Sequence, residues 1–406
     1  MRKEALENKM KHLKHLEDEF ESFKKKIDNY KYICLFGTGK CAERWGYEFA
    51  KECIGEKNNI LFFVDNNSDN WGKTVIDGLQ CLPPDSLIKY GKDLICIVLL
   101  SASNVNEVLK QLEEQGTEAL AVRMEWLYTN CLIEKYLNIK LPDIWGESEM
   151  GKYNRAVDEN EKVAVYTCIV DGYDELLQPS IKDPCCDYYC LGLDKPKELG
   201  VYQWINIADV IPQYLTGDYT RINRYCKVHP HIFFPQYQYS IYIDGNISVH
   251  TKLSHLAQKI GRIGIASYGM PSADDIYEHA TSLFLRNGLG EEDARERIRK
   301  QMQRYVEEGF PRYFGFTENG VMVREHNNEK CIKVMEIWWN EILNNSRRDQ
   351  LSFMYAVWKN GFMPQDIGYI ADSWREGPEF SANTHEKDYF KTTKFFKESP
   401  LGTSLE

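Results

Sequence analysis

The most informative stretch of the chain is Tyr239-Ser-Ile-Tyr-Ile-Asp-Gly-Asn246, a short apolar run that ends in polar residues. Such a run predicts a buried β-strand that ends at the carboxyl edge of a sheet. Open α/β sheets bind their ligands at that edge. We therefore expect Asp244 and Asn246, with only Gly245 between them, to hold a divalent cation, Mn²⁺ or Mg²⁺, against a diphosphate. An alternative is that Asp244 merely caps a turn.

Residues ahead of this stretch are candidates for binding the rest of a nucleotide. The apolar run 163–170 predicts another buried strand, whose end offers Thr167 and Asp171 to a base and ribose. His231 is a candidate phosphate donor or supplementary metal ligand, but a lone histidine is more often an ordinary hydrogen-bonded residue.

Three basic residues precede the Asp244 strand at regular spacing. Arg221, Arg224 and Lys227 recur every three residues, which places them on one face of a predicted helix. There they would bind a diphosphate and neutralise it as it leaves. A solvated basic face is the alternative for such a triplet.

The first 30 residues predict a helix with one apolar seam. This stretch is rich in Lys, Glu and Leu and has no Gly or Pro, and its apolar residues recur at alternating three- and four-residue steps. The seam either packs on its own domain or pairs with a second subunit in a homodimer. Its members are Leu13, Leu16, Phe20, Phe23, Ile27 and Tyr30.

Residues 31–130 predict a small Rossmann-like domain with a parallel sheet. A buried strand at 32–36 leads into a turn with Gly37 and Gly39, and a second strand ends at Asp65, about where a ribose-binding acid would lie. These residues could form a second nucleotide site, with NAD the less favoured ligand. Alternatively, the glycines only permit close packing of strand and helix.

Length and composition limit the remaining choices. A chain of 406 residues exceeds what one hydrophobic core usually organises. Its net charge of −11 argues against a nucleic-acid surface, which needs a basic footprint. No segment reaches the roughly 20 apolar residues of a membrane span. We expect a cytoplasmic protein, free or peripheral at the inner face of the membrane.

Several motifs of the second half occur in one order over about 190 residues, and together they resemble the glycosyltransferase-like proteins of bacterial surface-polysaccharide clusters and of plant cell-wall and mucilage synthesis. The resemblance implies a GT-A-like mixed α/β fold, a nucleotide-sugar donor, and a glycan or lipid-linked glycan acceptor. The motifs are residues 166–175, 221–227, 230–231, 239–246, 308–311 and 346–353.

The expected fold class is α/β, with an N-terminal helix, a Rossmann-like domain and a GT-A-like domain. The N-terminal residues 63–73 also resemble the small Rossmann-like domains that accompany sugar-modifying and polysaccharide-assembly proteins. The boundaries we expect are a helical segment at 1–30, the Rossmann-like domain at 31–130, a connector at 131–161, the GT-A-like domain at 162–365 and a C-terminal tail at 366–406.

Glycosyl transfer also needs a group beside the reacting carbon, and three residues are candidates. Asp349 and Gln350 precede an apolar helical pattern, so we expect them at a helix N-terminus. Asp349 would deprotonate the acceptor hydroxyl or support an oxocarbenium-like transition state, unless it is only an N-cap. Glu318 is the other candidate carboxylate.

Two other functions remain open at this point. In the first, residues 31–130 are the active half of an NAD-dependent sugar oxidoreductase or epimerase, although no Tyr-x-x-x-Lys pair follows the glycine turn. In the second, the chain is a non-catalytic scaffold that binds a nucleotide sugar.

Overall fold

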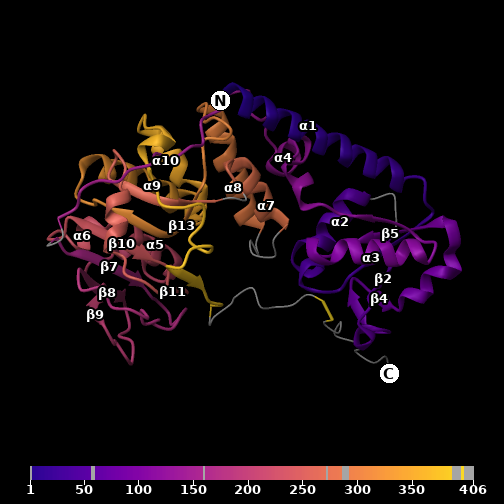
Figure 1. Ribbon diagram of the computed structural model, residues 1–406, viewed down its shortest axis with the longest axis horizontal. Helices are drawn as coiled ribbons and strands as arrows, with labels where there is room; N and C mark the ends of the chain where they lie inside the picture. The colour runs from indigo at the N-terminus through magenta and orange to yellow at the C-terminus, as the bar shows by residue number, and fades with distance from the viewer. Residues whose placement is uncertain are drawn as a thin grey trace. The chain divides into compact units, whose positions relative to one another are not determined.

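A computed structural model describes residues 2–55, 60–158, 161–270, 273–285, 292–385 and 395–396. The chain divides into two compact units. Unit 1 contains residues 1–136, 281–291 and 389–406, and unit 2 contains residues 137–280 and 292–388. The mixed α/β class, the N-terminal helix and the Rossmann-like sheet that we expected are confirmed (Figure 1).

Unit 1 is built on a six-stranded sheet in the order β3-β4-β2-β1-β5-β6. All neighbours are parallel except β3 and β4, which form an antiparallel pair at one edge. The strands are β1 (Tyr32–Phe36), β2 (Ile60–Val64), β3 (Thr74–Ile76), β4 (Leu79–Leu82), β5 (Leu94–Val98) and β6 (Glu118–Ala121).

Helices cover both faces of this sheet because the strand residues alternate between two cores. On one face Ile33 and Leu35 of β1 pack with residues of α1 and α2, and on the other Cys34 and Phe36 pack with residues of α3. The helices are α1 (Arg2–Ile27), α2 (Tyr47–Ile54), α3 (Ala102–Glu114) and α4 (Asn130–Leu137).

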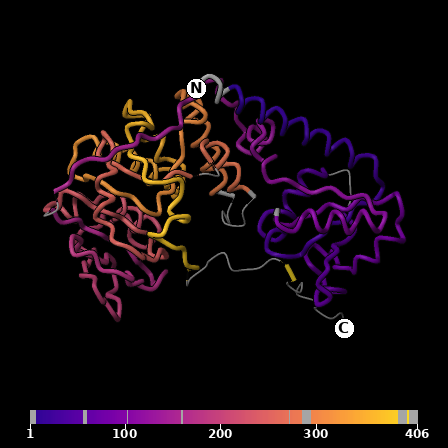
Figure 2. The backbone as a smooth tube through the Cα atoms, viewed as in Figure 1, coloured from indigo at the N-terminus to yellow at the C-terminus, as the bar shows by residue number. Residues whose placement is uncertain are grey.

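The apolar seam of α1 packs on its own unit. Phe20 and Phe23 contact the indole of Trp126, with ring centroids 5.7 and 4.7 Å apart, and Leu16 and Ile27 are buried in the same core. Of the two roles expected for the seam, these contacts show this one, and the course of the α1 backbone can be followed in Figure 2. The structure gives no support to a dimer through α1.

Unit 2 is built on a seven-stranded mixed sheet in the order β14-β12-β13-β10-β7-β8-β9. Strand β10 lies at its centre, parallel to β7 and antiparallel to β13. The strands are β7 (Val163–Cys168), β8 (Cys186–Gly192), β9 (Tyr202–Asn206), β10 (Tyr239–Ile243), β12 (Ile265–Gly269), β13 (Thr317–Arg324) and β14 (Gly368–Tyr369).

A small second sheet and several helices complete the chain. Strand β11 (Ile247–Val249) directly follows the turn that contains Asp244. It pairs antiparallel with β15 (Phe380–Ala382), which lies near the end of the described chain. The helices are α5 (Tyr219–Val228), α6 (Pro230–Phe233), α7 (Ile276–Leu285), α8 (Glu292–Glu307), α9 (Glu329–Asn344) and α10 (Phe353–Lys359). Among the described residues, no helix is long and apolar enough to cross a membrane.

Two stretches that looked irregular in the sequence are structured in part. The expected connector begins with most of α4, and further along it the amides of Gly146 and Gly151 donate to the carbonyls of Arg312 and Ile367 in unit 2, over 2.7 and 2.9 Å. The expected tail contributes β14 and β15. Its residues 386–394 and 397–406 lie outside the described residues.

Candidate functional site

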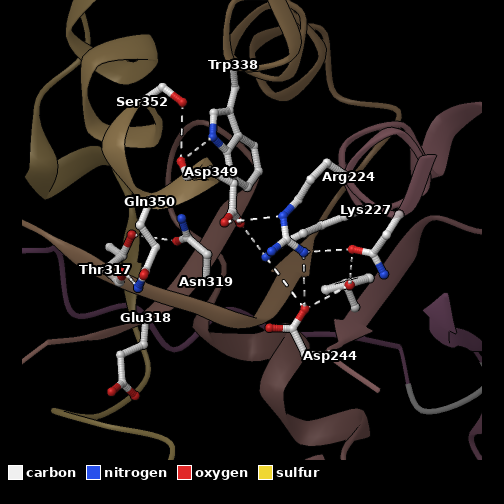
Figure 3. Close-up of polar contacts among 12 residues, drawn as sticks. Arg224, Lys227, Asp244, Thr317, Glu318, Asn319, Trp338, Asp349, Gln350 and Ser352 are labelled. Atoms are coloured by element: carbon white, nitrogen blue, oxygen red, sulfur yellow. Dashed lines mark hydrogen bonds and ion pairs between the residues drawn. The ribbon is translucent and has the colours of Figure 1, made fainter. Parts of the chain in front are cut away.

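A cluster of four charged side chains lies at the carboxyl end of β10 (Figure 3). Asp349 joins Lys227 through a 2.6 Å contact between Oδ2 and Nζ, and its other oxygen lies 3.4 Å from Arg224 Nε. Asp244 Oδ1 lies 3.9 Å from both the Lys227 ammonium and an Arg224 nitrogen. The structure thus brings Asp349 together with Arg224, Lys227 and Asp244, which lie far from it in the sequence.

Local structure explains how α5 delivers its two cations. The Asp218 side chain caps the helix by accepting from the backbone amide of Arg221 over 3.0 Å, which starts α5 at Tyr219. Arg224 and Lys227, three residues apart, then face β10. Lys227 is only 1% exposed and lies 5.0 Å from the ring of Tyr242, so aromatic surface covers the buried ammonium.

The electrostatics of the cluster keep Asp349 ionised. Burial by itself raises the pKa of its carboxyl, but Arg224 and Lys227 outweigh burial and lower it to about 2. Burial lowers the pKa of Arg224, and the two aspartates more than reverse this, so it lies above its ordinary value. The cluster thus pairs two basic side chains, Arg224 and Lys227, with two acidic ones, Asp244 and Asp349.

Sequence reasoning missed two residues that orient this cluster. The Tyr242 hydroxyl donates to Asp244 Oδ1 over 2.8 Å. Asn223 accepts from an Arg224 nitrogen at 2.7 Å and donates to the carbonyl of Cys168 at the end of β7, also at 2.7 Å. Tyr242 lies two residues before Asp244 on the same strand face, which is a signal that the period of a strand provides.

Thr167 lies close to Asp244, as expected from parallel neighbouring strands. Both line one small cavity together with Gly245 and Tyr202. Asp171 follows β7 in a tight turn, in which it and Gly172 have positive φ values of 57° and 55°.

Arg221 and His231 lie away from the cluster. Arg221 pairs with Asp218 over 2.7 Å and donates to the carbonyls of Ile342 and Asn345 near the end of α9. His231 is on α6, where burial and then the nearby Arg324 charge lower the pKa of its imidazole. The three-residue spacing alone could not show that Arg221 contacts the end of α9, whereas Arg224 and Lys227 reach the edge of the sheet.

Glu318 and Gln350 lie on different sides of β13. The Glu318 carboxylate accepts from Ser373 Oγ, the Trp374 amide and Arg375 Nε at 2.8 to 3.2 Å, and it points away from the charged cluster (Figure 3). Gln350 follows Asp349 in the short helical turn Asp349–Leu351, and its amide donates to the carbonyl of Thr317 over 3.4 Å. Asp349 is therefore the candidate carboxylate that shares the cluster.

The described residues contain no group of three or more His, Cys, Asp or Glu side chains that could hold a metal ion. Asp244 and Asn246 alone supply one carboxylate and one amide. The amide nitrogen of Asn246 donates to the Asn383 carbonyl over 3.0 Å, which directs its oxygen away from that contact. Such a pair suits Mg²⁺ or Mn²⁺ only as part of a shell that substrate phosphates and water complete.

In the glycine turn of unit 1, the side chain of Asp65 forms hydrogen bonds with the turn residue Thr38. Asp65 Oδ2 accepts from the Thr38 amide at 2.8 Å and from the Thr38 hydroxyl at 2.5 Å, and Oδ1 accepts from the Asn67 amide at 2.9 Å. Thr38 lies between Gly37 and Gly39. Its backbone amide, which could otherwise donate to a phosphate, already donates to the Asp65 carboxylate.

The comparison with protein families finds a match, and most of the matched segment lies in unit 2. A family model described as TOD1/MUCI70, glycosyltransferase-like domain, matches residues 192–367. Among solved structures, the apo structure of the bifunctional glycosyltransferase WbbM is similar, with 11% identity and a TM-score of 0.33 over 55% of this chain and 40% of that chain. No curated protein sequence matches. The segment 192–367, which contains both cations and both carboxylates of the cluster, is thus similar to the TOD1/MUCI70 glycosyltransferase-like domain, and the resemblance to a glycosyltransferase-like family is confirmed.

Proposed function

We propose that this protein is a glycosyltransferase that moves a sugar from a nucleotide-sugar donor to a glycan acceptor in surface-polysaccharide assembly. The observation that carries the proposal is the cluster of Arg224, Lys227, Asp244 and Asp349 at the carboxyl end of a central strand, where open α/β sheets bind nucleotides. The family match over residues 192–367 supports the same reaction class.

In this proposal the cluster binds the diphosphate of the donor. Arg224 and Lys227 contribute two positive charges, but Asp244 and Asp349 already balance them. A diphosphate with about two negative charges would therefore gain little net attraction from the four side chains alone. A divalent cation at Asp244 and Asn246 would restore the balance, which supports a donor bound together with Mg²⁺ or Mn²⁺.

Asp349 has an electrostatic role in this proposal and is not the general base. A general base works best when its pKa lies near the working pH, whereas the pKa of Asp349 is about 2. Its two cationic contacts instead hold Lys227 and Arg224 in place, so that they are oriented before the diphosphate leaves. Thr167, at the end of the neighbouring strand β7, would contact the nucleoside part.

The test is release of nucleoside diphosphate from a panel of nucleotide sugars in the presence of Mn²⁺. We expect turnover of at least one donor by the wild type and a loss of at least a hundredfold in Asp244→Asn. Asp187→Asn is a matched control, because this aspartate lies near the amino end of β8 and its carboxylate accepts from the Tyr237 hydroxyl. Equal turnover by wild type and Asp244→Asn would remove the proposal.

A further inference from the structure

Asn319 on β13 is a buried amide with one end held and the other end without a partner. The Thr317 hydroxyl donates to Asn319 Oδ1 over 2.7 Å, and this bond fixes the orientation of the amide. Asn319 is 1% exposed, and its Nδ2 has no hydrogen-bond partner among the described residues. A buried donor left unsatisfied is costly, so the fold retains this group at an expense.

The position of Asn319 places this donor beside the proposed donor site. The next residue, Gly320, accepts from the Asp244 amide over 2.8 Å, so Asn319 lies one residue from the carboxyl end of β10. On the other side, Gln350 donates to the carbonyl of Thr317. Figure 3 shows the Asn319 amide on the same side of β13 as Gln350 and Asp349, whereas Glu318 points to the opposite side.

An irregularity in β13 explains this orientation. The pairing with β12 steps from Met322 opposite Ser267 to Glu318 opposite Tyr268, so the strand contains unmatched residues at this point. Such irregularities redirect side chains from the regular alternation, and they are frequent beside active sites. In β13 the irregularity lies between Glu318 and the regularly paired residues that begin at Met322. The Glu318 carboxylate accepts a hydrogen bond from the Ser373 hydroxyl.

We infer that Asn319 is a sugar-positioning residue, whose Nδ2 donates to a hydroxyl oxygen of the sugar that is transferred. This inference rests on the proposed function. The charge of the diphosphate calls for Arg224 and Lys227, while a neutral amide donor matches a neutral hydroxyl acceptor. A site built to hydrogen-bond a hydroxyl discriminates strongly against a ligand that lacks it, because the buried donor is then left unpaired.

The experiment compares two ligands on wild type and Asn319→Leu, a substitution of similar volume without the amide. The first ligand is the nucleotide sugar that the wild type turns over fastest in the donor panel, and the second is the nucleoside diphosphate released from it. Both are titrated by calorimetry with Mn²⁺. We expect Asn319→Leu to bind the nucleotide sugar at least tenfold more weakly and the nucleoside diphosphate with unchanged affinity. The melting temperature checks that the variant is folded, because the change removes an unsatisfied donor but also the acceptor of the Thr317 hydroxyl, and these two effects oppose each other.

A matched control comes from Ser240, whose hydroxyl is also buried without a partner among the described residues but lies in the amino-terminal half of β10. Ser240→Ala should leave both affinities unchanged. If Asn319→Leu does not fold, Asn319→Ala tests the same loss of the donor. Nucleotide-sugar affinity equal to wild type in a folded Asn319 variant would overturn the inference alone. Absence of nucleoside diphosphate binding by the wild type would overturn the proposed function, and the inference with it.

Discussion

At the scale of single residues, the contact between Asp349 and Lys227 shows how a buried ion pair is maintained. Both side chains are almost excluded from water, at 8% and 1% exposure, which is costly for each charge taken alone. The 2.6 Å contact and the second cation, Arg224, offset that cost. Removing one partner leaves the others uncompensated, which makes Asp349 a sensitive position for stability.

Asp349→Asn should therefore destabilise unit 2 by about 3–5 kcal/mol, the usual effect of breaking a buried pair from one side. Urea unfolding followed by tryptophan fluorescence measures this change, because Trp338 donates its indole N–H to the Asp349 carbonyl. Asp187→Asn, which affects a partly exposed carboxylate, should change stability by less than about 1 kcal/mol. Equal stability of Asp349→Asn and the wild type would contradict the buried-pair account.

Low pH should remove the contribution of ionised Asp349 to the stability of the fold. The pKa of Asp349 falls from an ordinary 3.8 to about 2 on folding, so its ionised form stabilises the folded chain above pH 4. This stability is lost as the pH falls through 2, and its size is about 2 kcal/mol from the shift. Wild type should therefore lose about that much more stability than Asp349→Asn between pH 5 and pH 2. Parallel curves for the two proteins would show that folding does not lower the pKa of Asp349.

At the scale of elements, α1 stabilises unit 1 through a narrow seam. Phe23 is buried against Trp126, with ring centroids 4.7 Å apart and an interplanar angle of 54°. Phe23→Ala should lower the stability of unit 1 by about 3–5 kcal/mol. Chemical denaturation checks this, and Lys25→Ala on the exposed side of α1 is the control. Sedimentation would contradict the packing account if deleting residues 1–28 halved the mass of a protein that stayed folded.

The turn between β1 and α2 allows a second prediction at this scale. Asp65 accepts three hydrogen bonds that close the turn, so Asp65→Asn should destabilise unit 1 by about 1–3 kcal/mol. Because the carboxylate occupies the Thr38 amide, we also expect NAD at millimolar concentration to leave the melting temperature of the wild type unchanged. A saturable NAD-dependent rise in melting temperature would show that a ligand displaces Asp65.

The elements also show which parts of the fold could be predicted from the sequence. Long apolar runs such as 32–36 and 239–243 gave β1 and β10 correctly, because buried central strands have few polar residues. The short strands β3, β14 and β15 escaped prediction, since two or three residues have no measurable period. The mixed polarity of β9 also hid that strand from prediction.

The site could be predicted from the sequence only for residues whose positions follow from the period of a single strand or helix. Asp244 was expected at a strand end and lies there, and Lys227 and Arg224 were expected on one helix face. Their pairing with Asp349 could not be derived, because it joins segments more than 120 residues apart. Asn319 was missed because its orientation depends on an irregularity in β13 that no local pattern indicates.

At the scale of the whole molecule, the charge of the chain and the charge of the site differ. The chain carries a net charge of −11, and long-range attraction therefore does not favour an anionic donor. Arg224 and Lys227 supply positive charge locally, and Asp244 and Asp349 cancel it at short range. Under the proposed function, a nucleotide sugar would bind this site with a balanced charge only together with an added cation.

Calorimetric titration of nucleoside diphosphate with and without Mn²⁺ tests this central claim most directly. We expect wild type to bind at least a hundredfold more tightly with Mn²⁺, and Asp244→Asn with Mn²⁺ to bind no better than wild type without it. Binding that is equally tight in both proteins, or independent of the cation, would contradict the assignment of Asp244 and its neighbouring cations as the diphosphate site.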